Sequence, residues 1–418
     1  MRRDLFWDLK SIEEAREILR ERFPGRAPGL TRERVPLLRT VGHEPADHLP
    51  APRDVPGFRR STVDGYAVRA ADTSRAAETF PSYLRVTESV AMGEVPRFSL
   101  GAGEAAEIAT GGMLPQGADA VVMLEYTDRS LPEEIEVVRP VVEGEDVIRE
   151  DEDVSWGQVV FEDGTYLRPP HVGVLAALGL AHAEVWSPLR AAVFSTGEEV
   201  VAPGEPPPPA RICDSNGPML LAALECDGVE ANYEGILPDH QDEVMEALQD
   251  ALSRAFLVLI SGSSSVGRRD VAARVIEALG PPGALFHGVA MTPGKPTIAG
   301  GTEDGRAVFG LPGHPVSAQV AYNVLVRDVV YRLQGRNRAP VEPRVEAAMA
   351  RPLPGVSGRT QFVRVALKEG RDGLEAHPIM GKSGLLHTLA RADGLVEIPS
   401  TRRGVDAGET VEVMLLVP

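Results

Sequence analysis

The chain has 418 residues, of which 43% are hydrophobic and 25% charged, and its formal net charge is −18. This length exceeds that of one domain and indicates roughly two to four domains, each with enough apolar side chains for a core. The acidic balance argues against a general nucleic-acid or anionic-membrane surface, so an anionic ligand would need a local positive pocket.

The two cysteines, Cys213 and Cys226, make neither a disulfide framework nor a metal cluster, as is typical of a reducing cytoplasm. No apolar run approaches the length of a membrane span. The N-terminal residues carry Asp and Glu throughout and lack the apolar region of a signal peptide. We therefore expect a cytoplasmic protein without a membrane anchor.

Residues 9–23 are predicted to form an amphipathic helix that begins with a capping box made by Ser11 and Glu14. Pro169 and Pro170 begin a second predicted helix. We expect both helices to lie in one discontinuous N-terminal domain, residues 1–50 plus 145–187, because the character of the chain changes between them.

Residues 51–144 alternate short β-like runs with turns, which predicts a mostly-β domain inserted into the N-terminal one. Two dense motifs stand out in it. Asp64 precedes Gly65, a pair that by default indicates a tight turn, and Thr110 begins a glycine loop. Composition alone raises neither motif above a hairpin prediction.

Residues 188–336 alternate apolar runs with helical patterns, which is typical of a doubly wound α/β domain with buried parallel strands. The runs are LRAAVF, FLVLI, LFHGVAM and RAVFG. The loops that follow them are STGEEV, SGSSSVGRRD, TPGKP and LPGHPVS. Ligands of such sheets bind outside the carboxyl ends of the strands, so we predict that these four loops meet at one rim and bind a phosphate-bearing ligand.

The loop GSSSVGRR has the spacing of a phosphate-binding loop, but Arg268 and Arg269 stand where that motif needs Lys and then Ser or Thr. An ordinary P-loop nucleotidase is therefore a poor fit. Small residues still allow backbone N–H groups to face an anion at the start of a helix. Asp270 begins that helix, and the alternative is that it only caps the helix, a role worth about 1 kcal/mol.

The other loops also have two interpretations each. Glu199 is a candidate ligand or a solvated surface carboxylate, and Lys295 is a point charge for phosphate or part of a surface turn. His314 is catalytic or, as is more usual for a lone turn histidine, structural. The motif DSNG at residues 214–217 indicates a helix N-cap.

Residues 337–418 return to β-like patterns, among which FVRVALK alternates with a period of two. We predict a small C-terminal β barrel or sandwich. Its motif MGKSG, residues 380–384, either presents a charge to a neighbouring pocket or forms a plain turn.

Together these motifs resemble those of the molybdopterin molybdenumtransferases, the MoeA-type family that is similar to the C-terminal domain of gephyrin. The blocks STVDGYAV, TGGMLPQGADAVV, SVGRRD, PGKP and GLPGHPVS stand in the order and spacing of that family and cover nearly the whole chain. The resemblance implies a multidomain α/β protein. Its parts would be an elongated N-terminal dimerisation domain, the inserted β domain, a central molybdopterin-binding-like domain and a C-terminal small β barrel.

The resemblance also implies an activity. The family transfers molybdenum from molybdate into adenylated molybdopterin and releases AMP, with Mg²⁺ as the helper ion. It implies a homodimer whose site lies between the central domain of one subunit and the β domain of the other. A molybdopterin adenylyltransferase would act upstream, and apo-molybdoenzymes or their chaperones would take the product.

Matching the motifs position by position assigns two sets of residues. The implied catalytic residues are Asp64, Thr110, Asp153, Glu199 and Asp270, of which Glu199 and Asp270 would hold Mg²⁺. The implied substrate-binding residues are Ser195, Thr196, Gly262, Ser265, Gly267, Lys295, Gly313, Ser317, Arg364 and Ser383. Arg359 remains an alternative to Arg364.

The chain departs from the family pattern at four positions. Thr292 replaces a common lysine, Ser263 replaces a glycine, His314 replaces the more usual asparagine, and Asp151 stands where glycine is expected. Two other functions remain open: another molybdopterin- or nucleotide-handling enzyme on the same central fold, and a non-catalytic dimeric scaffold. The inserted β domain argues against the first, and the retained acidic residues argue against the second.

Overall fold

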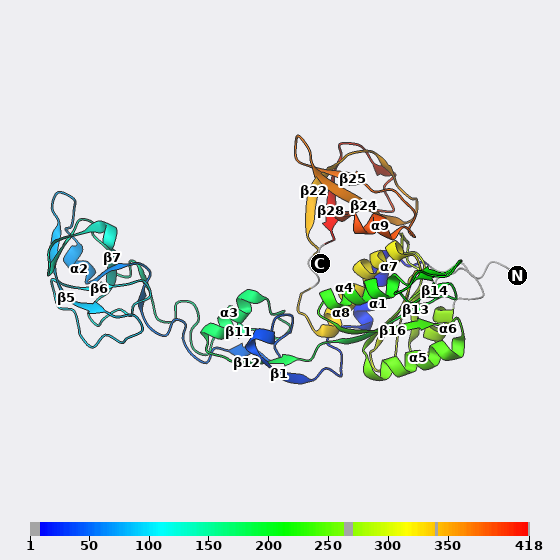
Figure 1. Ribbon diagram of the computed structural model, residues 1–418, viewed down its shortest axis with the longest axis horizontal. Coiled ribbons are helices and arrows are strands. Elements are labelled where there is room, and N and C mark those ends of the chain that lie inside the picture. Colours follow the sequence, from blue (N-terminus) through cyan, green and yellow to red (C-terminus); the bar gives the residue numbers. More distant parts are fainter. Residues whose placement is uncertain (1–8, 263–270, 339–341, 417–418) are drawn as a thin grey trace.

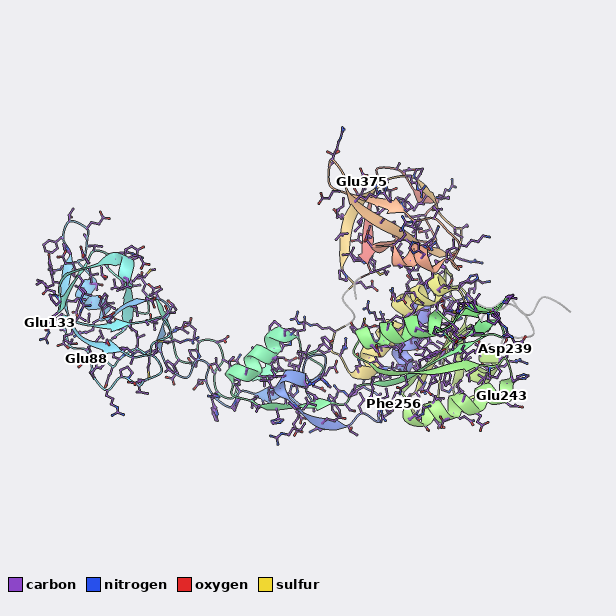
Figure 2. All side chains as sticks on the ribbon, in the orientation of Figure 1. Glu88, Glu133, Asp239, Glu243, Phe256 and Glu375 are labelled. Carbon is purple, nitrogen blue, oxygen red and sulfur yellow. The ribbon has the colours of Figure 1, made fainter. Side chains whose placement is uncertain are left out.

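The computed structural model describes residues 9–262, 271–338 and 342–416. The chain forms an elongated molecule with the inserted β domain at one end and the central domain, with the C-terminal barrel beside it, at the other (Figure 1). In Figure 2, Glu88 and Glu133 mark the β domain, and Asp239 and Glu243 mark the opposite end of the molecule. Among the described residues, no helix has the length and apolar character needed to cross a membrane.

The central sheet has six strands in the order β16-β13-β17-β21-β20-β18. Their bounds are Glu230–Leu237, Arg190–Thr196, Leu257–Ser261, Ala307–Leu311, Ile298–Gly301 and Gly283–His287. The first four strands are parallel, and three of them, β13, β17 and β21, are apolar runs that the sequence predicts as parallel strands, whereas β16 is not among the predicted runs. The fourth predicted run, β18, has the same direction as β21, but the sequence does not predict β20, which returns from the TPGKP turn and pairs antiparallel with both.

Helices cover both faces of this sheet, and alternate residues of β13 enter opposite cores. Val193 packs in a core with helices of one face, and Ala192 and Phe194 pack in a second core with helices of the other. The helices of the first core are α1 (Ile12–Arg22), α4 (Asn216–Cys226), α7 (Pro315–Ala321) and α8 (Arg327–Gln334), with η3 (Tyr322–Val326) between the last two. Those of the second are α5 (Gln241–Arg254) and α6 (Val271–Ala278).

The first helix is where it was predicted, but it lies in a different domain. α1 begins with the capping box, since Ser11 Oγ accepts from Glu14 N at 3.1 Å and Glu14 Oε2 accepts from Ser11 N at 2.7 Å. Its buried face, which includes Leu19, packs in the same core as Leu189 of the central domain. The prediction that α1 shares a domain with the Pro169 helix is therefore wrong, because its apolar stripe covers the central sheet.

Two antiparallel segments of chain, residues 31–61 and 147–187, form what we call the arm. Three short strand pairs hold it together: β1 with β12, β2 with β11 and β3 with β10. These strands are Arg32–Pro36, His182–Trp186, Leu49–Pro50, Val159–Phe161, Arg60–Ser61 and Val147–Ile148, and the arm also contains α3 (Pro169–Ala177) and η1 (Leu37–Arg39). The arm connects the β domain to the central domain (Figure 1).

The β domain contains a six-stranded sheet in the order β7-β4-β6-β5-β9-β8. The strands are Ala120–Met123, Gly65–Val68, Glu104–Ile108, Ser82–Val90, Glu134–Val137 and Thr127–Leu131, accompanied by α2 (Ala70–Thr73) and η2 (Leu124–Tyr126). The tight-turn prediction for Asp64–Gly65 is wrong, because Gly65 begins β4. A Cβ at Gly65 would lie 2.0 Å from the Val122 carbonyl oxygen, so the close approach of two strands requires this glycine.

The C-terminal domain is a closed five-stranded barrel, since β24 pairs with β26 as well as with β25. Its strands β22, β24, β25, β26 and β28 are Arg344–Met349, Thr360–Glu369, Leu374–Pro378, Gly394–Ile398 and Thr410–Leu415. Smaller elements are β14 (Val200–Val201), β15 (Ile212–Cys213), β23 (Leu353–Pro354), β27 (Gly404–Val405) and α9 (Leu386–Ala390). β19 (Met291–Thr292) leaves the central domain and pairs in parallel with β24.

A buried ion pair joins the arm to the central domain. Arg336 Nε donates to Glu44 Oε1 at 2.9 Å, and both side chains are buried. The guanidinium of Arg336 stacks on the rings of Tyr166 and Tyr331, each 4.0 Å from its centroid, and donates to the backbone oxygen of Asp227 at 2.7 Å. Burial raises the pKa of Glu44 to about 7, although Arg336 opposes this shift.

The Glu44→Gln variant tests this joint. The pKa of Glu44 in the folded state exceeds its ordinary value of 4.5, so the bound proton stabilises the fold at low pH. This stabilisation is lost as the pH rises through about 7. The free energy of unfolding is measured in urea for wild type and variant. The difference, wild type minus variant, should fall by at most about 3 kcal/mol as the pH rises from about 4.5 through about 7, and it should then stay constant. Glu33→Gln, at an exposed position on β1, is the control, and its difference from wild type should not depend on pH. The prediction would be contradicted if the difference for Glu44→Gln were also independent of pH.

Candidate functional site

A cleft of about 840 Å³ lies between the rim of the central sheet and the barrel. The loops after β13, β17 and β21 and the turn between β19 and β20 line one wall, and residues of the barrel line the other. The prediction that the four loops of the central domain meet at one rim is therefore confirmed. The cleft is bounded by two domains of the same chain.

Nine of the predicted site residues line this cleft. They are Ser195, Thr196, Glu199, Gly262, Lys295, Gly313, Ser317, Arg364 and Ser383. Three others, Ser265, Gly267 and Asp270, lie outside the described residues. Arg359 does not line the cleft, so the geometry favours Arg364 as the arginine of the site.

Backbone contacts hold the loops of the rim together. A Cβ at Gly262, whose φ is +108°, would lie 2.1 Å from the Thr196 carbonyl oxygen. A Cβ at Gly313 would lie 3.3 Å from the Gly262 Cα atom, so the loops after β13, β17 and β21 pack backbone against backbone. Ser195 is 2% exposed at the end of β13, and its Oγ has no hydrogen-bond partner among the residues that the structure describes. A buried hydroxyl without a partner at a cleft is typical of a ligand-binding position.

Asn216 ties these loops to α4, a role that sequence reasoning missed. Its Nδ2 donates to Ser261 Oγ at 2.7 Å and to the Gly313 carbonyl oxygen at 2.8 Å. The preceding Asp214 accepts through Oδ1 from the backbone N–H groups of Asn216 and Gly217, at 3.0 and 3.1 Å. The DSNG motif therefore begins a helix, as predicted. In addition, its asparagine holds the loops after β17 and β21 in place through these two hydrogen bonds. The position of the motif near the strand ends was the signal for this second role.

The wall formed by the barrel contributes a buried cation. Arg364 is 8% exposed, and its guanidinium donates to the Gly381 carbonyl oxygen at 2.7 Å and to Thr388 Oγ1. Burial lowers the pKa of Arg364. Within the described residues no carboxylate forms an ion pair with it, and a buried charge without a counter-ion is costly. An anion bound in the cleft would supply that counter-ion.

Lys295 enters the cleft from a fixed turn. The Lys295 carbonyl oxygen accepts from Val289 N at 2.8 Å, and Thr297 Oγ1 donates to the Gly294 carbonyl oxygen at 2.7 Å. Gly294 has a φ of +113°, and a Cβ there would lie 2.6 Å from Met291 Cε. Because the turn is held on both sides, the start of the Lys295 side chain is placed at the rim.

The remaining predicted catalytic residues lie far from the cleft of their own chain. Asp64 and Thr110 form a pair in the β domain, where Asp64 Oδ1 accepts from Thr110 N at 2.7 Å and from Thr110 Oγ1 at 2.9 Å. These bonds hold the pKa of Asp64 below its ordinary value. Asp153 is exposed in the arm, where its N–H donates to the Val55 carbonyl oxygen at 3.0 Å. The β domain lies at the opposite end of the molecule from the central domain and the barrel (Figures 1 and 2), whose residues line the cleft.

Three family models match consecutive parts of the chain. The model described as the MoeA N-terminal region (domain I and II) matches residues 10–179. The one described as a probable molybdopterin binding domain matches residues 192–332, and the MoeA C-terminal region (domain IV) matches residues 346–416. The order of domains that the motifs predict is the order in which these models match.

Curated relatives match over nearly the full chain. A molybdopterin molybdenumtransferase of Bacillus subtilis is 31% identical over 89% of this chain and 86% of its own length. One of Haemophilus influenzae is 32% identical over 96% of this chain and 98% of its own. A solved structure of a molybdopterin biosynthesis MoeA protein from Pyrococcus horikoshii superposes with a TM-score of 0.83 at 31% identity, covering 98% of this chain and 100% of that one.

These matches, together with a cleft at the rim of a doubly wound sheet, define a multidomain protein whose central domain matches the model of a probable molybdopterin binding domain. The chain belongs to the MoeA family, as the resemblance of its motifs implies.

The pair formed by Asp64 and Thr110 generates a prediction. The Thr110→Val variant keeps the backbone N–H and removes the hydroxyl, so Asp64 loses one of the two hydrogen bonds that favour its charged form. The pKa of Asp64 should rise towards its ordinary value, as measured by ¹³C NMR titration of the carboxylate. Thr62→Val, a change at an exposed neighbouring position, should leave the titration as in wild type. A pKa unchanged in Thr110→Val would show that the hydroxyl bond is absent in solution.

Proposed function

We propose that this chain is a molybdopterin molybdenumtransferase that transfers molybdenum from molybdate into adenylated molybdopterin and releases AMP. Its family assigns it to molybdenum cofactor biosynthesis as a transferase. The observation that carries the proposal is the cleft itself. Two cationic side chains, Lys295 and the buried Arg364, line it from opposite domains in a protein whose net charge is −18.

The substrates are anions, and the cleft suits them. Adenylated molybdopterin carries a phosphoanhydride-type bond, and its cleavage needs the charge on the phosphate oxygens to be neutralised. Lys295 and Arg364 supply positive charge, and the glycine-rich backbone at Gly262 and Gly313 allows close approach of the ligand. Ser195 and Ser317 add hydroxyl groups on the same wall. These groups would bind and orient the phosphates next to molybdate.

Glu199 gives the cleft a ligand suited to Mg²⁺. Its carboxylate lines the cleft beside Ser195 and Thr196, and a carboxylate oxygen is the hard donor that this ion prefers. Mg²⁺ is usually held by one or two carboxylates together with phosphate oxygens and water, so Glu199 with Asp270 would suffice. When bound, the ion neutralises charge on phosphate oxygens.

We further propose that the working unit is a homodimer. In one chain, the β domain, to which Asp64 and Thr110 belong, lies at the far end of the arm from the central domain and the barrel (Figure 1), and these two line the cleft. A second copy related by two-fold symmetry can place its β domain at that cleft. By the same symmetry, the β domain of the first copy then lies at the cleft of the second. Asp64, whose pKa Thr110 lowers, would enter as a carboxylate that orients water or molybdate, and Asp153 would support it from the arm.

The reaction defines the neighbours of the protein in its pathway. An adenylyltransferase must supply the adenylated pterin, and apo-molybdoenzymes or their chaperones must take up the metallated product. We expect these steps to occur in the cytoplasm, since both cysteines are free thiols.

The reaction is tested by incubating the protein with adenylated molybdopterin and molybdate and measuring AMP. Asp64→Ala, Glu199→Ala and Asp270→Ala should each lower molybdate-dependent AMP release at least about 100-fold, because each removes a charged group from the proposed site. Glu33→Ala, an exposed change on the arm, is the control. Retained activity in all three variants, or AMP release that does not require molybdate, would refute the proposal.

Mixing two inactive variants tests the shared site. In a heterodimer of Asp64→Ala and Glu199→Ala subunits, one site combines the intact Asp64 of one copy with the intact Glu199 of the other. Randomly exchanged subunits should therefore regain about a quarter of the wild-type rate. A mixture of Glu199→Ala with Glu199→Ala/Asp64→Ala subunits should stay inactive. The absence of recovery in the first mixture, with subunit exchange verified by mass, would rule out a site that combines Asp64 of one copy with Glu199 of the other.

A further inference from the structure

A histidine and a serine from different domains meet in the cleft. His314 is the N-cap residue of α7 in the central domain, and Ser383 lies in the barrel loop between β25 and α9. His314 Nδ1 lies 2.8 Å from Ser383 Oγ, and both residues line the cleft. The resemblance to the family assigns Ser383 to substrate binding, and the proposed function gives His314 no role.

The backbone on both sides of this contact is fixed. The Gly313 carbonyl oxygen accepts from Asn216 Nδ2 at 2.8 Å, which holds the residue before His314. The Ser383 carbonyl oxygen accepts from Val316 N at 3.2 Å, so the barrel itself satisfies an N–H group of the first turn of α7. The His314 side chain makes no capping bond to its own helix. It is therefore available for Ser383.

The ring also has a defined position. A Cβ at Gly384 would lie 3.7 Å from His314 Cδ2, so the backbone after Ser383 packs beside the imidazole. The distance to Ser383 Oγ is that of an ordinary hydrogen bond. The contact therefore joins two rigid walls of the cleft.

The direction of this hydrogen bond determines what Ser383 can offer a ligand. A serine hydroxyl has one proton. If His314 Nδ1 accepts, that proton is used within the pair and the serine presents only lone pairs. If Nδ1–H donates, the hydroxyl proton is free to point into the cleft. In a cleft that is also lined by Lys295 and Arg364, and so suits anions, only the second arrangement gives the ligand another donor.

We propose that His314 is a positioning residue that donates from Nδ1 to Ser383 and so directs the serine proton to an oxyanion oxygen of the substrate. The oxygen belongs to a phosphate group or to molybdate, which present the same acceptor chemistry. The inference rests on the proposed function for the identity of the substrate and adds a specificity determinant to the same cleft.

Two isosteric variants test the polarity of the bond. The Asn side-chain nitrogen and the Asp oxygen occupy the same place along the chain as His Nδ1, but only Asn can donate. Binding of AMP and binding of molybdate are measured separately by calorimetry, with the full-length protein in the oligomeric state in which it is purified. His314→Asn should bind within about threefold of wild type, and His314→Asp should bind at least about tenfold more weakly, the effect of one charge-assisted hydrogen bond.

Two controls separate this role from charge and from packing. Asp also adds a negative charge, so the Asn and Asp variants are repeated in a Ser383→Ala background, where the difference between them should shrink. His377→Ala removes a barrel histidine that is hydrogen-bonded to Glu375 at 3.0 Å outside the cleft, and it should bind both probes as wild type does. A merely structural role for His314 would weaken the Asn and Asp variants alike and would overturn the proposal.

The two probes identify the oxyanion. A loss confined to AMP places Ser383 at the phosphate, and a loss confined to molybdate places it at the metal oxyanion; either supports the role of His314. Wild-type binding of both probes by His314→Asp overturns that role alone, whereas wild-type protein that binds neither probe overturns the proposed function with it. If His314→Asp fails to fold, ¹⁵N NMR of wild-type protein with AMP decides, because Nδ1 must carry a proton.

Discussion

The close approach of three strand ends is the constraint on which the site depends. Gly262 leaves no room for a side chain between itself and the Thr196 carbonyl oxygen, and Gly313 lies against Gly262 in turn. Asn216 then links the loops to α4 through Ser261 Oγ and the Gly313 carbonyl oxygen. Because the backbones touch, the polar residues that end each strand are displayed at fixed positions along one rim. A flexible set of loops would have to lose conformational entropy on binding, and this arrangement reduces that cost.

The barrel forms the second wall of the cleft and adds a second cation, Arg364, to the Lys295 of the rim. Arg364 is buried with neutral partners, so its positive charge is compensated only weakly before a ligand arrives. The loop between β25 and α9, whose Gly381 carbonyl oxygen accepts from Arg364, also brings Ser383 against His314. The proposed substrate site therefore depends on the relative position of two domains, and the backbone bond from Val316 N to the Ser383 carbonyl oxygen helps to maintain that position.

Much of this site follows from local sequence patterns. Short apolar runs followed by glycine-rich loops were enough to predict the rim that displays Ser195, Glu199 and Lys295, since strand direction decides where loops meet. The features that the sequence did not predict depend on contacts with residues that are distant along the chain. The second role of Asn216 needs Gly313, nearly a hundred residues away, and the place of α1 depends on which sheet its stripe covers. Asp64 gained meaning only from resemblance to a family, because a D-G pair by itself indicates a turn, and Gly65 proved to be a strand residue.

The short strand β19 belongs to the path of the central sheet and to the barrel at once. The chain leaves β18, adds Met291 and Thr292 to the edge of β24, turns through Lys295 and returns as β20. A further backbone bond from Thr360 N to the Ala290 carbonyl oxygen, 2.9 Å long, fastens the same stretch to the barrel. A rotation of the barrel would therefore also move the turn that contains Lys295. A change in the width of the cleft would therefore also change the position of Lys295.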